Sequence, residues 1–265
     1  MRAVILAAGR GSRLQGVTGR SPKCLARIGE LTLLERQIRS LRDCGVGDIV
    51  VVAGYRAEQV RRTCEPGVDL VINARYETTN SLYSLWLARE LLMDGFVVLN
   101  CDVLFHNQLM WDLLTTRDED ALLMAAMRDQ VYSDEEMKIQ ARCGCVAGIA
   151  KTLNPAETDG ENVGIAKFGP AGAAVLVQAL TRVVTSGGLR EWLPYAFDAF
   201  ARMRPLHIVE TRGLPWIEID SPEDYWRAQS EVLPAILASP TAPLFRRQES
   251  RPAHADRTGR PCRHV

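Results

Sequence analysis

The chain has 265 residues, of which 47% are hydrophobic and 24% charged, a composition typical of a globular protein with one or two domains. Lys and Arg number 32, as do Asp and Glu, and this balance argues against non-specific binding of nucleic acid. Without a run of about 18 apolar residues no transmembrane helix is expected. The apolar stretch after Arg2 is too short for a signal peptide and lacks a cleavage region.

Short apolar runs alternate with amphipathic segments through the first part of the chain. The runs have the pattern of strands buried on both faces and cover residues 3–7, 48–53, 68–73 and 95–99. The segments between them have helical spacing and cover residues 33–43, 57–62 and 81–92. This alternation at short spacing predicts a parallel sheet with right-handed crossovers.

The second part of the chain mixes strands and helices without that regularity. Strands are expected over residues 121–127, 137–142, 144–150, 163–168, 207–210 and 216–219. Helices are expected over residues 173–184, 189–201 and 221–237, and a polar loop over 154–162. The last helix has a strong start signal, because Ser221 can cap it and Pro222 suits its first turn.

The composition changes from Ser239 onward, where six arginines stand against two acids and few apolar residues remain. This pattern predicts a disordered basic tail over 239–265 and one folded domain over 1–238. Seven cysteines, an odd number in a chain too large to need disulfides, predict a reduced, cytoplasmic protein. Cys143 and Cys145 lack the second pair and the histidine of a structural zinc site.

A glycine-rich loop, AAGRGSRL, follows the first strand. Gly9 and Gly11 allow the backbone to approach a phosphate closely, and successive amide N–H groups can bind its oxygens. The loop is neither a complete Gly-x-Gly-x-x-Gly motif nor a P-loop. Arg13 in the loop and Lys23 in SPKCL are two cations suited to a triphosphate, although each alone is equally typical of a solvated surface residue.

Two strands end in aspartate. Asp102 closes VVLNCD, and Asp220 closes WIEID directly before the last helix. Ligands bind open α/β sheets at the carboxyl ends of the strands, and carboxylates suit Mg²⁺. These two residues are therefore candidate metal ligands, with helix capping by Asp220 or Ser221 as the alternative.

The order LAAGRGSRL, PKCL and LLERQI resembles the nucleotide-sugar pyrophosphorylase-like nucleotidyltransferase superfamily. VVVAGYRAEQV, NSLYSLWLA, LNCDVLF and WIEIDSPEDY resemble its choline-phosphate cytidylyltransferase branch, and the resemblance covers about residues 1–232. It implies an α/β, Rossmann-like three-layer fold with a mixed, mostly parallel central sheet and a small β insertion for the acceptor.

The resemblance also implies roles for individual residues. Lys23 would stabilise the α-phosphate, Arg13 would neutralise the leaving pyrophosphate, and Asp102 and Asp220 would hold Mg²⁺. Nucleotide contacts would come from Leu6, Ala8, Gly9, Gly11, Ser12, Gly54, Tyr55, Asn80 and Ser81. GYRAEQV is also compatible with a strand–turn–helix packing motif, and Asn80-Ser81 with a helix cap.

The acceptor site is less specific. By the same resemblance Lys138 would contact the acceptor phosphate and Glu161 its hydroxyl or amine, with a solvated strand charge and a loop acid as the alternatives. A quaternary ammonium needs aromatic faces, and the available ones are Trp192, Tyr195, Tyr132 and Trp216. Aromatic residues are also ordinary core residues, so choline itself is not assumed.

The implied reaction is Mg²⁺-dependent transfer of a nucleoside monophosphate, CMP from CTP, to a small phosphate or phosphonate, with release of pyrophosphate. Guanylyl, uridylyl or thymidylyl transfer to a sugar or cyclitol 1-phosphate is the alternative. A GT-A-like glycosyltransferase would have Asp-x-Asp where this chain has Asn100-Cys101-Asp102, and a non-catalytic nucleotide-binding protein would have lost Lys23, Asp102 or Asp220. No nucleic-acid or membrane partner is expected, and a homo-oligomer is compatible with the sequence.

Overall fold

The computed structural model describes residues 1–126 and 135–239. Within these ranges nine strands form one sheet in the order β5-β4-β1-β6-β11-β8-β12-β10-β9. Their bounds are β1 Arg2–Ala7, β4 Ile49–Ala53, β5 Val68–Ile72, β6 Phe96–Asn100, β8 Ala121–Ala125, β9 Lys138–Arg142, β10 Cys145–Ala150, β11 Gly160–Phe168 and β12 His207–Glu210. The half from β5 to β6 is parallel, and in the other half only β8 and β12 pair in parallel.

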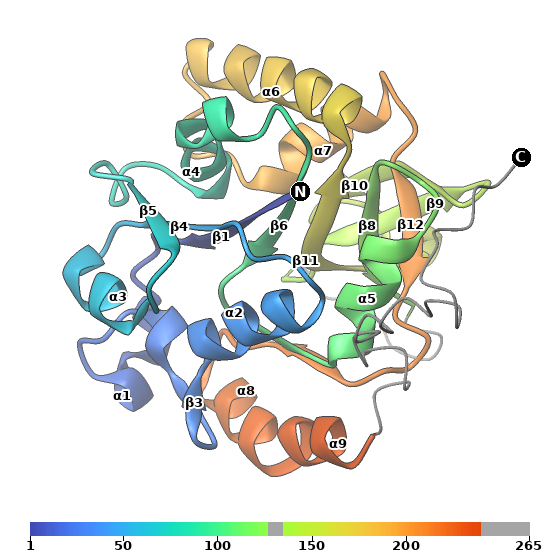
Figure 1. The fold of residues 1–265 in the computed structure, drawn as a ribbon. Helices are drawn as coiled ribbons and strands as arrows, with labels where there is room; N and C mark the ends of the chain where they lie inside the picture. The colour runs from blue at the N-terminus through green and yellow to red at the C-terminus, as the bar shows by residue number, and fades with distance from the viewer. Residues whose placement is uncertain (127–134, 240–265) are drawn as a thin grey trace, which may run out of the picture.

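Helices cover both faces of this sheet (Figure 1). Along β1 the side chains alternate, so that Val4 packs in the core beneath α4, α6 and α7, and Ile5 in the core beneath α2 and α5. The helices are α1 Gln15–Thr18, α2 Leu33–Asp43, α3 Ala57–Thr63, α4 Ser81–Leu87, α5 Asn107–Thr115, α6 Pro170–Thr185, α7 Leu193–Ala201, α8 Pro222–Arg227 and α9 Leu233–Ala238. The result is the expected three-layer α/β fold with a mixed sheet.

Two short antiparallel ribbons stand apart from the main sheet. β2 (Arg27–Ile28) pairs with β3 (Leu31–Thr32), and β7 (Val103–Phe105) pairs with β13 (Trp216–Glu218). A third, smaller core joins both ribbons to α8 and α9 and contains Ile28, Leu104, Ile217 and Leu233. The β7–β13 pairing brings the chain after β6 next to the last strand, which places Asp102 near Asp220.

Several expected boundaries differ from the structure. α7 begins at Leu193 instead of 189, because Pro194 belongs in a first helical turn. The expected loop 154–162 already contains the first residues of β11. The last helix is interrupted by a π-helical segment, Ala228–Val232, which ends two residues before Pro234, a residue that lacks a backbone N–H to donate. α5 and β7 were not expected from the sequence.

The expected tail beyond Ser239, the end of the expected strand 121–127 and Tyr132 lie outside the described residues. Across residues 1–126 and 135–239, none of the helices has the length and apolar character required to cross a bilayer.

Candidate active site

A cavity of about 370 Å³ lies at the carboxyl ends of β1 and β6, between the glycine-rich loop and the N-terminal ends of α4 and α7. Most of the residues predicted from the sequence line it. These are Leu6, Ala8, Gly9, Gly11, Arg13, Lys23, Asn80, Ser81, Asp102, Trp192 and Asp220. Residues from the first quarter of the chain therefore face residues from its last quarter across one cavity.

Two cations and two carboxylates alternate along one wall of the cavity. Nη2 of Arg13 donates to Oδ2 of Asp220 at 2.8 Å, and Nζ of Lys23 donates to Oδ2 of Asp102 at 2.8 Å. Lys23 also donates to Oδ1 of Asp220, which joins the two pairs. Burial lowers the pKa of Lys23, but the two aspartates raise it more, so that the net shift is upward and the ammonium stays charged.

Gly11 is needed for the placement of Lys23. Its φ is +62°, and a Cβ atom built on it would lie 2.6 Å from Cβ of Lys23. Most L-residues adopt this backbone conformation poorly, and this Cβ would overlap the lysine stem. The glycine therefore lets the loop and the lysine occupy neighbouring positions against the cavity.

The alternative that Asp220 serves only as a helix cap does not agree with the geometry. Ser221 caps α8, because the N–H of Asp224 donates to its Oγ at 3.2 Å and the carboxylate of Asp224 accepts from the Ser221 N–H at 2.9 Å. The side chain of Asp220 is left for Arg13 and Lys23. Its pKa is raised by burial but lowered more by Lys23, so that it is a carboxylate at neutral pH.

Glu218 is a third acid at this site that sequence reasoning did not identify. One oxygen each from Asp102, Glu218 and Asp220 lie within 4.8 Å of one another. Burial, with the charges of Asp102 and Asp220, raises the pKa of Glu218 to about 8. A signal was present, since residues two apart on a strand share a side and Glu218 precedes Asp220 by two.

This group of acids fits a divalent cation. Oδ1 of Asp102 is buried and has no hydrogen-bond partner among the described residues, so this oxygen has unused lone pairs on a side chain that lies beside the other two acids. Carboxylate oxygens are the ligands that Mg²⁺ takes in proteins. Glu218 thus joins the predicted pair as a third candidate metal ligand.

The start of α4 forms the opposite wall. Oδ1 of Asn80 accepts from the Ser81 N–H at 2.8 Å, and Oγ of Ser81 accepts from the Leu193 N–H at 2.9 Å. Both residues line the cavity while they also fix α4 and α7, so the capping interpretation of Asn80 holds together with its place at the site. Asn73, which was not predicted, is buried behind them and donates to Oγ of Ser84 at 3.1 Å.

Ser12, Gly54 and Tyr55 were predicted to contact the nucleotide but are not among the residues lining the cavity. The N–H of Tyr55 donates to the Ala8 carbonyl at 3.0 Å, and its hydroxyl donates to the Arg20 carbonyl. A Cβ on Gly54 would lie 2.8 Å from that Ala8 oxygen. Gly54 and Tyr55 thus support the glycine-rich loop from behind, and the neighbouring Tyr76 lines the cavity instead.

Lys138 and Glu161 also lie outside the cavity lining. Lys138 is fully buried, and its Nζ donates to the Lys151 carbonyl at 2.6 Å, so it is not the solvated strand charge of the alternative interpretation. Lys151 reaches the cavity itself, with Nζ 5.5 Å from the ring centroid of Trp192. The remaining lining residues that the sequence did not indicate are Asn73, Tyr76, Thr79, Ser84, Asn100, Cys101, Glu135, Met137, Lys151, Asn162, Pro194 and Glu218.

We expect Glu161→Gln to stabilise the protein at high pH. Burial, with the nearby charge of Glu136, raises the pKa of Glu161 from 4.5 to about 7. The unfolded chain therefore loses this proton first, and wild-type stability falls as the pH rises from about 4.5 to 7. Glu161→Gln has no proton to lose at this position. Its free energy of unfolding relative to that of the wild type should therefore rise by about 2 kcal/mol between pH 5 and pH 8.

Urea unfolding at both pH values measures this difference. Glu157→Gln, at an exposed acid four residues before Glu161, is the control and should not show this gain between the two pH values. An advantage of Glu161→Gln that stays constant from pH 5 to pH 8 would contradict the raised pKa.

Comparison with known proteins relates this site to a family. A model of the MobA-like NTP transferase domain matches residues 3–194. A choline-phosphate cytidylyltransferase of Streptococcus pneumoniae is 28% identical over 242 residues, 88% of this chain and 98% of that protein. A bifunctional IPC transferase and DIPP synthase of Rubrobacter xylanophilus is 32% identical over 252 residues, and the chain spans 55% of its length.

The fold agrees as well. The solved structure of a CTP:phosphocholine cytidylyltransferase from Streptococcus pneumoniae superimposes with a TM-score of 0.71 at 25% identity, over 86% of this chain and 97% of that one. The resemblance stated from the motifs is confirmed, and with it the expectation of an enzyme that transfers nucleotides. The chain belongs to the MobA-like NTP transferase domain family.

Proposed function

We propose that this protein transfers CMP from CTP to a small phosphorylated alcohol or a phosphonate and releases pyrophosphate. The observation that carries the proposal is the chain of contacts from Arg13 through Asp220 and Lys23 to Asp102, beside a glycine-rich loop. It provides fixed positive charge and a carboxylate set in one cavity, as a triphosphate requires. The pneumococcal relative, named as a choline-phosphate cytidylyltransferase, supports cytidine as the base and a phosphate ester as the acceptor.

The chemical step does not require a strong general base from the protein. The acceptor phosphate or phosphonate is ionised at neutral pH, so its oxygen attacks the α-phosphorus directly, a new P–O bond forms, and the bond to pyrophosphate breaks. Lys23 keeps its proton and offsets the charge that grows on the α-phosphate oxygens. Arg13, half-exposed at the cavity mouth, neutralises the departing pyrophosphate. Catalysis thus rests on positioning and charge.

Asp102, Glu218 and Asp220 are the residues that would hold Mg²⁺. The ion supplies charge neutralisation and polarises phosphate oxygens when it is bound. Lys23 contacts both aspartates and Arg13 contacts Asp220, so these two cations hold the aspartate side chains in place beside the cavity.

A pyrophosphate-release screen tests the proposal. Purified protein and Mg²⁺ are combined with each of ATP, CTP, GTP, UTP and dTTP, and with choline phosphate, 2-aminoethylphosphonate, inositol phosphate or several sugar 1-phosphates. Release with CTP and an amino-alcohol phosphate or phosphonate is the expected result. Release with another triphosphate and a sugar or cyclitol phosphate would keep the mechanism and overturn the base and acceptor. If no combination releases pyrophosphate and the protein binds no triphosphate, the proposal is contradicted.

A further inference from the structure

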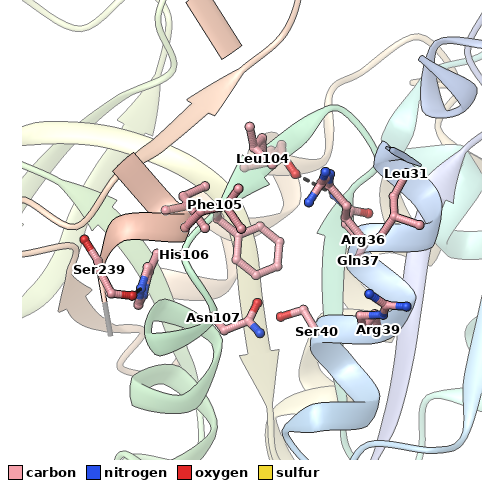
Figure 2. Close-up of a pocket in the computed structure, with 13 residues that line it drawn as sticks. Leu31, Arg36, Gln37, Arg39, Ser40, Leu104, Phe105, His106, Asn107 and Ser239 are labelled. Carbon is pink, nitrogen blue, oxygen red and sulfur yellow. Dashed lines mark hydrogen bonds between the residues drawn. The ribbon is translucent and has the colours of Figure 1, made fainter. Parts of the chain in front are cut away.

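A second cavity, of about 310 Å³, lies on the other side of the β6–β7 turn from the active site. Residues of α2, β7 and α9 line it, and Figure 2 shows Gln37 and Ser40 on α2 facing the segment from Leu104 to Asn107. Gln37 is 1% exposed, although amides are costly to bury without partners. Gln37 lies between this cavity and the turn that carries Asp102.

Gln37 donates both of its N–H bonds to the backbone around Asp102. Its Nε2 lies 2.8 Å from the carbonyl oxygen of Asn100 and 2.9 Å from that of Val103. Since both neighbours are acceptors, the amide nitrogen and not the oxygen must face them. Oε1 is buried and has no hydrogen-bond partner in the described part of the chain. Gln37 therefore spans the turn from one end to the other.

The same turn is held from its opposite side. The N–H of Ile219 donates to the carbonyl of Asp102 at 3.0 Å, and β13 pairs with β7 immediately beyond. The side chain of Gln37 and the backbone of Ile219 thus fix the turn from two elements that are distant in sequence. The turn that carries the half-buried carboxylate of Asp102 is therefore held by both contacts.

We propose that Gln37 is a positioning residue, which holds the β6–β7 turn so that Asp102 meets Glu218 and Asp220 at the distance a divalent cation needs. This inference rests on the proposed function, in which those three acids hold Mg²⁺. Removal of the two N–H donors takes these hydrogen bonds from the carbonyls of Asn100 and Val103 and frees the turn. The carboxylates then spread, and affinity for the cation falls even though no ligand has been changed.

The test is direct titration with Mn²⁺, followed by electron paramagnetic resonance, in the absence of nucleotide. Gln37→Glu keeps the shape of the side chain but sets carboxylate oxygens against two carbonyls, and Gln37→Met removes the donors without adding charge. Both variants should weaken Mn²⁺ binding by about 10-fold or more. Ser40 lies one turn along α2 in the same cavity lining, and its Oγ has no hydrogen-bond partner among the described residues, so Ser40→Ala should bind Mn²⁺ like the wild type.

Loss of stability alone is separated from loss of positioning by Leu41→Ala, a buried core change on the same helix. If it lowers the melting temperature as much as Gln37→Glu but leaves Mn²⁺ affinity intact, the positioning role is supported. If Leu41→Ala weakens Mn²⁺ binding as much as Gln37→Glu does, the positioning role is overturned.

Asp102→Asn in the same titration separates this inference from the proposed function. Normal Mn²⁺ binding by Asp102→Asn would overturn the metal site and the inference with it. Loss of binding in Asp102→Asn together with normal binding in both Gln37 variants would overturn the inference alone.

Discussion

Replacing Lys23 by Met is expected to lower kcat by about 10²- to 10³-fold, the loss seen when a single fixed electrostatic stabiliser is removed from an active site. Lys23 is 8% exposed and bonds to both Asp102 and Asp220, so its ammonium is held in place before substrate arrives. Met has a similar length and no charge. The effect should therefore fall mainly on kcat, because the charge on the α-phosphate grows during the chemical step.

Steady-state pyrophosphate release measures this loss. Lys167→Met is a matched control, because Lys167 is also buried but donates to the carbonyl of Thr116, away from the cavity. Circular dichroism shows whether the Lys23 variant stays folded with two carboxylates left without their shared cation. Retention of at least half of the wild-type kcat in folded Lys23→Met protein would contradict the role of Lys23.

Asp102→Asn should reduce turnover by about 10²-fold or more, because the change removes one negative charge without changing the shape of the side chain. Asp102 has a buried oxygen without a hydrogen-bond partner in residues 1–126 and 135–239, and it also anchors Lys23. Two functions are therefore lost together, cation binding and lysine placement. The concentration of Mg²⁺ that gives half-maximal activity should rise as kcat falls.

A Mg²⁺ titration of the initial rate separates these two losses. Asp112→Asn, on α5 and bonded to Gln108 instead of to the site, serves as the control and should behave like the wild type. Wild-type turnover in Asp102→Asn at ordinary Mg²⁺ concentrations would rule out Asp102 as a ligand.

The sequence indicated those parts of the site that follow from local pattern. Arg13 and Lys23 were predicted because they lie close along the chain to the glycine-rich loop, and Asp102 and Asp220 because each follows an apolar strand. Glu218 was missed, because it lies inside an apolar run and only the fold shows that three acids converge.

The sequence pattern was less informative where the role of a residue depends on which side of a strand its side chain lies. Lys138 lies at the start of β9, and nothing in its neighbours indicates that its side chain is fully buried against the Lys151 carbonyl. Lys151, 13 residues later, reaches the cavity instead. Gln37 likewise has the helical spacing of an ordinary core position, and its bonds to Asn100 and Val103 arise only when α2 packs beside β6.

The ³¹P NMR spectrum of one reaction tests the central claim most directly. Wild-type protein is mixed with Mg²⁺, CTP, choline phosphate and 2-aminoethylphosphonate, with folded Lys23→Met protein in a parallel tube. Attack at the α-phosphorus predicts inorganic pyrophosphate and a new phosphoanhydride between cytidine monophosphate and one acceptor, with almost no product from the variant. Formation of CDP together with a diphosphate of the acceptor, or with inorganic phosphate from attack by water, would show that the α-phosphorus is not the site of attack and would contradict the account.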